Sequence, residues 1–173
     1  MKNISWIFLF AVTISFLIGA CEKDKNSGSV YNMYDSIFIS QAASSNLIEI
    51  TLGQLAADSA TDPSIKDFGA LMVSDHTTQQ QQLQALASQI GIGIVTTIDQ
   101  SHQMLLDSLE TLKGSSFDSV YIFSQVRDHD NTITLFKHES GNGFHKEVKA
   151  YAYQTLPEIN EHFISARTLS TKF

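Results

Sequence analysis

Two Asp-His dipeptides, Asp75-His76 and Asp128-His129, are the residues of this sequence best suited to chemistry. Each lies within a long amphipathic helical pattern, at a point where the apolar stripe should continue. At least one member of each pair should therefore face the core. Buried carboxylates and imidazoles are costly unless they are paired, hydrogen-bonded or bound to a metal ion. The two dipeptides therefore mark the candidate functional layer.

Other polar residues are expected at the same height in the helices. At 1.5 Å per residue, Glu49 and the Asp75-His76 pair both lie roughly 17–19 Å from the turn that joins their helices. The same count across the second pair of helices brings Asp128-His129 level with Glu158, and His162 follows one helical turn later. The expected layer draws on all four long helices and consists of Glu49, Asp75, His76, Asp128, His129, Glu158 and His162.

A transition-metal site is the first interpretation of this layer. Imidazole and carboxylate groups suit a single ion such as zinc or iron, and the candidate ligands are Glu49, His76, His129 and His162. Carboxylates commonly orient ligating histidines, which gives supporting positions to Asp75, Asp128 and Glu158. A di-iron centre is disfavoured, because it requires Glu-x-x-His motifs on two core helices. Only Asp99-x-x-His102 approaches that motif, and it falls in a connecting segment.

Two other interpretations of the layer stay open. The side chains could form a hydrogen-bonded network that fixes the register of the helices without metal or catalysis. They could also line a small-molecule pocket in which Glu and His act as acid and base. No nucleophile is placed by a motif, and the contiguous Ser74-Asp75-His76 cannot form a triad, since helical neighbours point in different directions. The sequence therefore predicts no catalytic residue and favours a protein that is not an enzyme.

The elements that must position this layer are helices, because helical periodicity dominates and strand-like alternation is scarce. Asp62 and Pro63 are suited to begin a helix and Gly91 to end one. The expected helices cover residues 34–60, 63–90, 115–140 and 145–169, with a shorter helix within 97–113. Two helical hairpins joined by a longer crossover are typical of ferritin-like four-helix bundles. The fold class is therefore all-α, with the short helix in the crossover between helices two and three.

The first twenty residues have the composition of an export signal. A basic start at Lys2 and the apolar run 4–18 precede Gly19-Ala20-Cys21, and the run is short for a membrane span. The segment around Cys21 resembles the lipobox of bacterial lipoproteins, which implies lipidation of Cys21 and removal of residues 1–20. Residues 21–33 would then be a flexible tether to a domain at 34–173. The net charge of −7 without a basic cluster disfavours nucleic acid as a partner, and no protein partner or oligomer is specified.

Several segments of the domain resemble one known family. They are Ser45–Ile50 with Gly53–Ala56, Val73–His76, Phe117-Asp118-x-x-Tyr121, Val126–His129, and Thr155–Pro157 followed by His162. This pattern is similar to a bacterial ferritin-like family of unknown function, described as outer-membrane or periplasmic proteins. The resemblance implies a helical bundle in the cell envelope, and it adds Asp118 to the supporting polar residues. Since Glu22 rather than Asp follows Cys21, the resemblance to bacterial lipoproteins favours the outer membrane as the site of the anchor.

Overall fold

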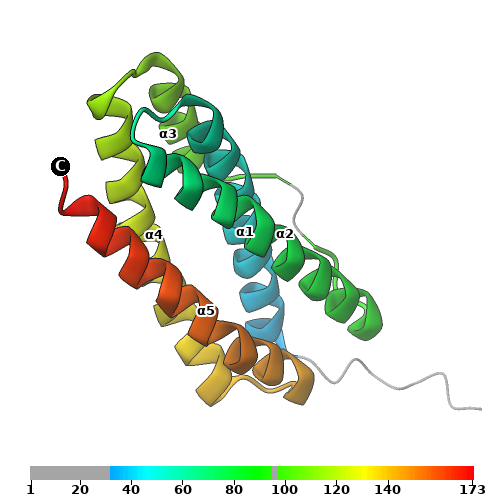
Figure 1. Cartoon of the computed structure of the whole chain (residues 1–173). Helices are drawn as coiled ribbons and strands as arrows, with labels where there is room; N and C mark the ends of the chain where they lie inside the picture. The colour runs from blue at the N-terminus through cyan, green and yellow to red at the C-terminus, as the bar shows by residue number, and fades with distance from the viewer. Residues whose placement is uncertain (1–31, 95–96) are drawn as a thin grey trace, which may run out of the picture.

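The computed structural model describes residues 32–94 and 97–173, and every element in those ranges is an α-helix (Figure 1). The helices are α1 (Met33–Ser59), α2 (Pro63–Ile90), α3 (Gln100–Thr111), α4 (Ser115–Asn142) and α5 (Lys146–Ser170). The predicted all-α class is confirmed, with four long helices and a short one in the crossover. The predicted signal peptide, Cys21 and most of the tether lie outside the described residues. None of the described helices is long and apolar enough to cross a membrane.

Local capping explains the start of α1 and both ends of α2. Asn32 and Asp35 form a reciprocal capping box at the start of α1. At α2, the predicted Asp62 cap and first-turn Pro63 are both present, and Gly91 ends the helix with a φ of 76°. The turn expected at residues 141–143 begins later than predicted. The helix continues to Asn142, whose side chain donates a hydrogen bond to a carbonyl one turn earlier.

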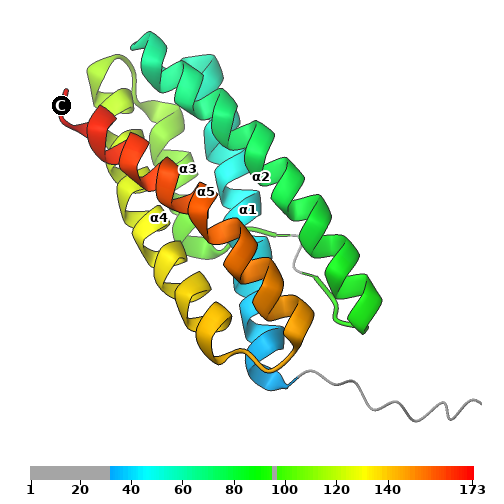
Figure 2. The same cartoon turned by 60° about the horizontal axis from the view of Figure 1, so that its bottom comes forward.

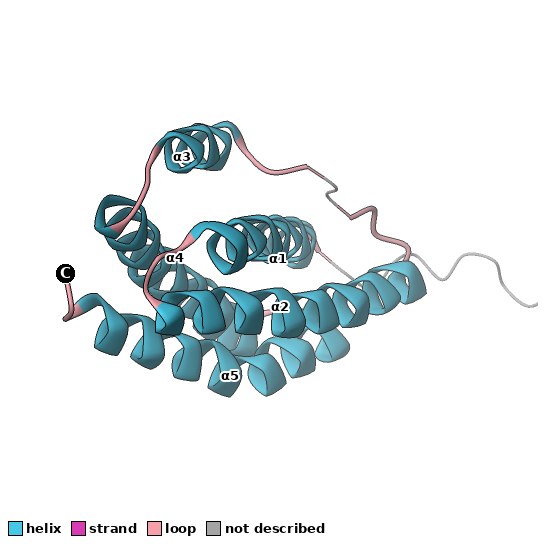
Figure 3. Ribbon diagram, turned by 45° about the horizontal axis from the view of Figure 1, so that its top comes forward, coloured by secondary structure: helices cyan, strands magenta, loops and turns pink. Residues whose placement is uncertain are grey.

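The four long helices form a bundle of two antiparallel hairpins (Figure 2). Helices α1 and α2 form one hairpin and α4 and α5 the other, while α1 contacts α4 and α2 contacts α5. The crossover returns the chain along the bundle, so α3 packs outside against α1 and α4 (Figure 3). At one end, the Asp118 carboxylate accepts hydrogen bonds from the backbone N–H groups of Thr61 and Asp62, each at 2.9 Å. This contact ties the start of α4 to the α1–α2 turn.

The apolar core is divided into two clusters along the bundle axis. The cluster near the α4–α5 turn is built on large side chains that include Phe38, Leu83, Phe136 and Ile159. The cluster near the α1–α2 turn includes Leu52, Phe68, Met72 and Tyr121. Between the two clusters lies a buried polar layer, and it contains Glu49, His76, Gln125, His129 and His162. The bundle therefore holds its polar side chains at mid-height, with packed apolar material on both sides.

Candidate metal centre

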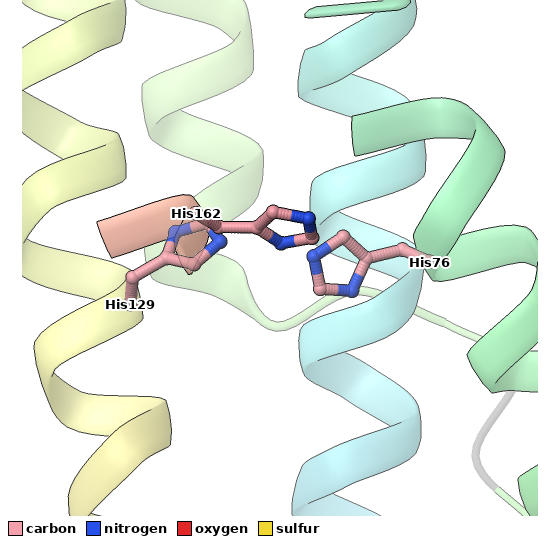
Figure 4. Close-up of side chains that lie close together, drawn as sticks. All are labelled: His76, His129 and His162. Carbon is pink, nitrogen blue, oxygen red and sulfur yellow. The ribbon is translucent and has the colours of Figure 1, made fainter. Parts of the chain in front are cut away.

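Three histidines from three different helices meet in the polar layer (Figure 4). His76 comes from α2, His129 from α4 and His162 from α5. Their ring centroids are 5.4–5.8 Å apart, and each residue is only 2–3% exposed. One ring nitrogen of each histidine lies within 4.8 Å of one from each of the other two. The structure thus brings together the three histidines predicted as ligands.

The outer nitrogen of the His76 ring faces a side-chain amide. Its Nδ1 atom lies 3.0 Å from Oδ1 of Asn46. The amide orientation of Asn46 is consistent with a second contact, because its Nδ2 donates to Oε1 of Gln80 at 3.2 Å. An amide oxygen can only accept a hydrogen bond. The proton of neutral His76 therefore resides on Nδ1.

The other two rings are held by acceptors in the same way. Nδ1 of His129 lies 3.0 Å from the backbone carbonyl of Gln125, one helical turn earlier. Nε2 of His162 lies 3.1 Å from Oδ2 of Asp75. Carbonyl and carboxylate oxygens have no proton to donate. Each of these outer nitrogens therefore donates, which fixes the tautomer of its ring.

The remaining nitrogens of the three rings have no partner. Nε2 of His76, Nε2 of His129 and Nδ1 of His162 are buried and make no hydrogen bond within the described part of the chain. Burial and the neighbouring imidazoles hold the pKa of His76 well below its ordinary value. Burial also lowers the pKa of His129 to about 4, with His162 contributing. Both rings are therefore neutral at pH 7, and their unprotonated nitrogens are available as ligands.

Glu49 is in the layer but does not share the space between the rings. Its Oε1 atom lies 3.8 Å from Nδ1 of His129, the outer nitrogen of that ring. Burial, together with the charge of Asp128, raises the pKa of Glu49 to about 8. The carboxyl is therefore protonated at neutral pH. The structure gives Glu49 a supporting position behind His129 in place of the ligand position expected from the sequence.

An acidic groove opens beside His162 on the outside of the bundle. It is lined by Asp75, Glu158 and Glu161 and by His162 itself. Asp75, Glu158 and His162 each offer one ligating atom within 4.8 Å of the others. Asp75 and Glu158 are half-buried, whereas His162 is buried. The groove therefore connects solvent to His162, whose ring is hydrogen-bonded to Asp75.

Asp128 and Asp118 do not lie next to the three rings. Asp128 pairs with Arg127 at 3.0 Å and faces Nε2 of His102 at 3.7 Å. Asp128 and Asp99 raise the pKa of His102 to about 9 against the effect of its burial, so this ring is a cation. These contacts join α3 to α4 through an ion pair. Asp118, expected in the supporting shell, instead binds the α1–α2 turn at the end of the bundle.

Three contacts of this layer escaped the sequence interpretation. Asn46 lies three residues before Glu49, hence on the same helix face, and that spacing could have identified it. The backbone carbonyl of Gln125 has no sequence signal, because any residue type would supply it. The sequence placed His102 in a connecting segment, and only the fold shows that its ring meets a carboxylate from α4.

Comparisons with known proteins give a family and a fold. The sequence profile of a family described as "Domain of unknown function (DUF4142)" matches residues 22–169. A solved structure titled "Crystal structure of DUF305 fragment from Deinococcus radiodurans" is similar in fold, with a TM-score of 0.73 at 11% sequence identity. The similarity covers 83% of this chain and 99% of the fragment. No curated protein matches the sequence.

Proposed function

The chain belongs to the DUF4142 family, and we propose that its bundle binds a single transition-metal ion through His76, His129 and His162. The observation that carries this proposal is the set of three unpartnered ring nitrogens in one buried space. Leaving a buried acceptor unsatisfied costs on the order of 1–3 kcal/mol per group. One ion bound by all three nitrogens would remove that cost at once.

The donor set favours a borderline divalent ion. Three imidazoles suit zinc, iron(II) or copper(II) and offer little to magnesium or calcium, which prefer oxygen. Three protein ligands leave a fourth position for water or another small ligand. Asp75, hydrogen-bonded to His162 at 3.1 Å, supplies a carboxylate that makes this ring a stronger donor. Because the rings are only 2–3% exposed, the site is better suited to holding an ion than to turning over a substrate.

The acidic groove provides a route for the ion. Asp75, Glu158 and Glu161 place negative charge at the surface, and His162 connects that surface to the interior. Carboxylates in a cleft raise the local concentration of cations and speed their association. The ion would then pass from carboxylate oxygens to the imidazole nitrogens that bind it more tightly.

Metal content and affinity test the proposal directly. The protein, purified without a histidine tag, is expected to take up one equivalent of zinc in competition with a chromophoric chelator. His76→Ala and His129→Ala should abolish stoichiometric binding. His138→Ala is the matched control, because His138 is exposed and lies outside the layer. If wild type and the His76→Ala variant bind zinc, iron(II) and copper(II) equally weakly, the layer is a hydrogen-bonded core without metal.

A change at Asp75 tests the supporting contact separately. Asp75→Asn keeps an acceptor for Nε2 of His162 but removes its charge. Loss of such an outer partner commonly weakens metal binding by 10–100-fold, so we expect a tenfold or greater loss of zinc affinity. Asp67→Asn, at an exposed position on the same helix, should leave the affinity unchanged. Equal affinities for the two variants would contradict the role of Asp75.

We further propose that the protein is a lipoprotein of the bacterial envelope, anchored through Cys21 at the outer membrane. The apolar segment that ends in Gly19-Ala20-Cys21 supports this location, and several acyl chains would hold the protein firmly to a bilayer. The ferritin-like relationship is also a proposal, supported by a long crossover between two antiparallel hairpins. Labelled palmitate should be incorporated by the wild type and not by Cys21→Ser. Equal labelling of both would exclude Cys21 as the lipidated residue.

A further inference from the structure

One end of the bundle exposes apolar side chains where the described chain begins. Met33, Tyr34 and Ile37 are 67%, 63% and 44% exposed on the first turns of α1. Residues three or four positions apart share a helix face, so Ile37 lies beside both Met33 and Tyr34. Phe144, in the α4–α5 turn, is 61% exposed. We call these four residues the basal patch.

Hydrogen bonds to one buried carboxylate bring the two parts of the basal patch together. Asp35 accepts a bond from the backbone N–H of Phe144 at 2.9 Å and from that of His145 at 3.2 Å. Asp35 immediately follows Tyr34 in the sequence, so the turn that carries Phe144 is fixed beside the first turn of α1. Figure 2 shows the same juxtaposition at the end of the bundle from which α1 starts.

Two lysines lie beside the basal patch, and one of them is paired with Glu147. Lys146 is almost fully exposed, and Lys149 reaches back to the carbonyl of Gly141 in the same turn. Two acids of this region, Asp35 and Glu139, are buried in the bundle, whereas Glu147 is paired with Lys146. Aromatic and aliphatic side chains flanked by lysines are typical of segments that lie in the membrane interface. Two lysines are too few to attach the protein by charge alone, so apolar contact must dominate.

The position of Cys21 decides which surface this end would meet. Eleven Cα–Cα steps connect Cys21 to Asn32, where the described chain begins. Even fully extended, they span no more than about 40 Å. Helix α1 has 27 residues and is itself about 40 Å long, so an anchored Cys21 limits this end of the bundle to about 40 Å from the bilayer, whereas the opposite end can lie up to about 80 Å away.

We infer that the basal patch docks onto the lipid bilayer and stands the bundle on the membrane with Phe144 and Tyr34 at the interface. The inference rests on the proposed anchor, but it can be tested independently of natural lipidation. Cys21 is the sole cysteine of the chain, so a maleimide lipid can attach the protein from Cys21 onward to a vesicle. The docked state orients the acidic groove along the side of the bundle, accessible to ions in solution.

A tryptophan at the basal patch reports contact with lipid. The sole tryptophan of the sequence is Trp6, so a chain that starts at Cys21 has none. Phe144→Trp, attached to vesicles of phosphatidylethanolamine and phosphatidylglycerol, should shift its emission to the blue. Lipids brominated on the acyl chain should quench that emission at least twofold. Ile164→Trp is the matched control, because Ile164 is 62% exposed on the C-terminal half of α5, and it should show neither effect.

A second variant separates lipid docking from contact between protein molecules. Tyr34→Ser in the Phe144→Trp background should reduce the quenching by lipid, since it removes an exposed ring from the same patch. Equal quenching of Phe144→Trp and Ile164→Trp would overturn the inference. A dimer in lipid-free solution that dissociates on Phe144→Ser would also overturn it and assign the basal patch to a second copy of the chain. Zinc binding by the vesicle-bound protein is a separate measurement, so either result would leave the metal proposal standing.

Discussion

Two groups of buried titratable side chains, one in the mid-height layer and one near the α4–α5 turn, show how surroundings determine protonation. In the mid-height layer, burial keeps His76 and His129 neutral and leaves one lone pair of each ring unused. Near the α4–α5 turn, burial opposes the charge of Asp35, but backbone hydrogen bonds from residues 32, 144 and 145 outweigh it and lower its pKa. The adjacent Glu139 has no comparable set of donors. Its burial and the neighbouring Asp35 raise its pKa to about 7.

The raised pKa of Glu139 predicts a specific dependence of stability on pH. Between pH 4.5 and about 7 the folded state binds a proton at Glu139 that the unfolded state has released, so stability falls as the pH rises through this window. The shift corresponds to about 3 kcal/mol. Glu139→Gln stays neutral and can donate to Asp35. We expect it to raise the free energy of unfolding by about 2 kcal/mol at pH 8 and to have little effect at pH 4.5.

Urea unfolding at a series of pH values measures this effect. Glu110→Gln, at an exposed position on α3, removes the same charge without a buried partner. Its free energy of unfolding should differ from that of the wild type by the same amount at every pH. The quantity to compare is the difference between the two variants, since His76, His129 and Glu49 also have shifted pKa values. If the difference does not grow between pH 4.5 and pH 8, the assigned protonation of Glu139 is wrong.

At the scale of the helices, close contact between α1 and α2 depends on two glycines. A Cβ atom added to Gly69 would lie 2.7 Å from the backbone carbonyl oxygen of Gly53 and 2.8 Å from the backbone nitrogen of Ala57. A Cβ added to Gly53 would meet the carbonyl oxygen of Gly69 at 2.8 Å. Both neighbours are backbone atoms that cannot rotate away. The two helices therefore cross with their backbones in contact, between the histidine layer and the α1–α2 turn.

Gly69→Ala should therefore destabilise the protein although alanine is the better helix former. Alanine gains about 1 kcal/mol in helix propensity over glycine, but overpacking at a rigid contact costs roughly 1–3 kcal/mol. We expect a net loss of up to about 2 kcal/mol in the free energy of unfolding, measured by urea denaturation. Gly141→Ala is the control, since that glycine is helical with open space around it, and this variant should be neutral or stabilised. Stabilisation of Gly69→Ala would show that the helices can separate at little cost.

The helix boundaries could be predicted from the sequence because their causes are local. Asp62, Pro63 and Gly91 each act within one turn of their own position, so the pattern of residues contains the necessary information. The docking of α3 could not be predicted in this way. It depends on His102 meeting Asp128, which is 26 positions away in the sequence, and the helical pattern around either residue carries no trace of the other.

At the scale of the whole molecule, the polar layer joins the two hairpins. His76 belongs to the α1–α2 hairpin, whereas His129 and His162 belong to the α4–α5 hairpin. Counting residues from the turns was enough to predict that these three histidines share one height. It could not predict that Glu49 faces an outer nitrogen or that Asp118 binds a turn, because rotation about the helix axis and the side-chain torsions decide such contacts. The residue types of the site were therefore accessible from the sequence, but its division into ligands and supporting groups required the fold.

An ion that bridges the two hairpins should stabilise the fold as a unit. Binding to the folded state alone adds about 2.7 kcal/mol when free metal is 100 times its dissociation constant, which lowers the population of the globally unfolded state about 100-fold. In hydrogen exchange, zinc should therefore protect the slowest amides of α2, α4 and α5 together. The same experiment on His76→Ala should show no added protection in any helix, because the ion can no longer connect the hairpins. Protection confined to α4 and α5 in the wild type would mean that the ion is held within one hairpin, and that His76 is not a ligand.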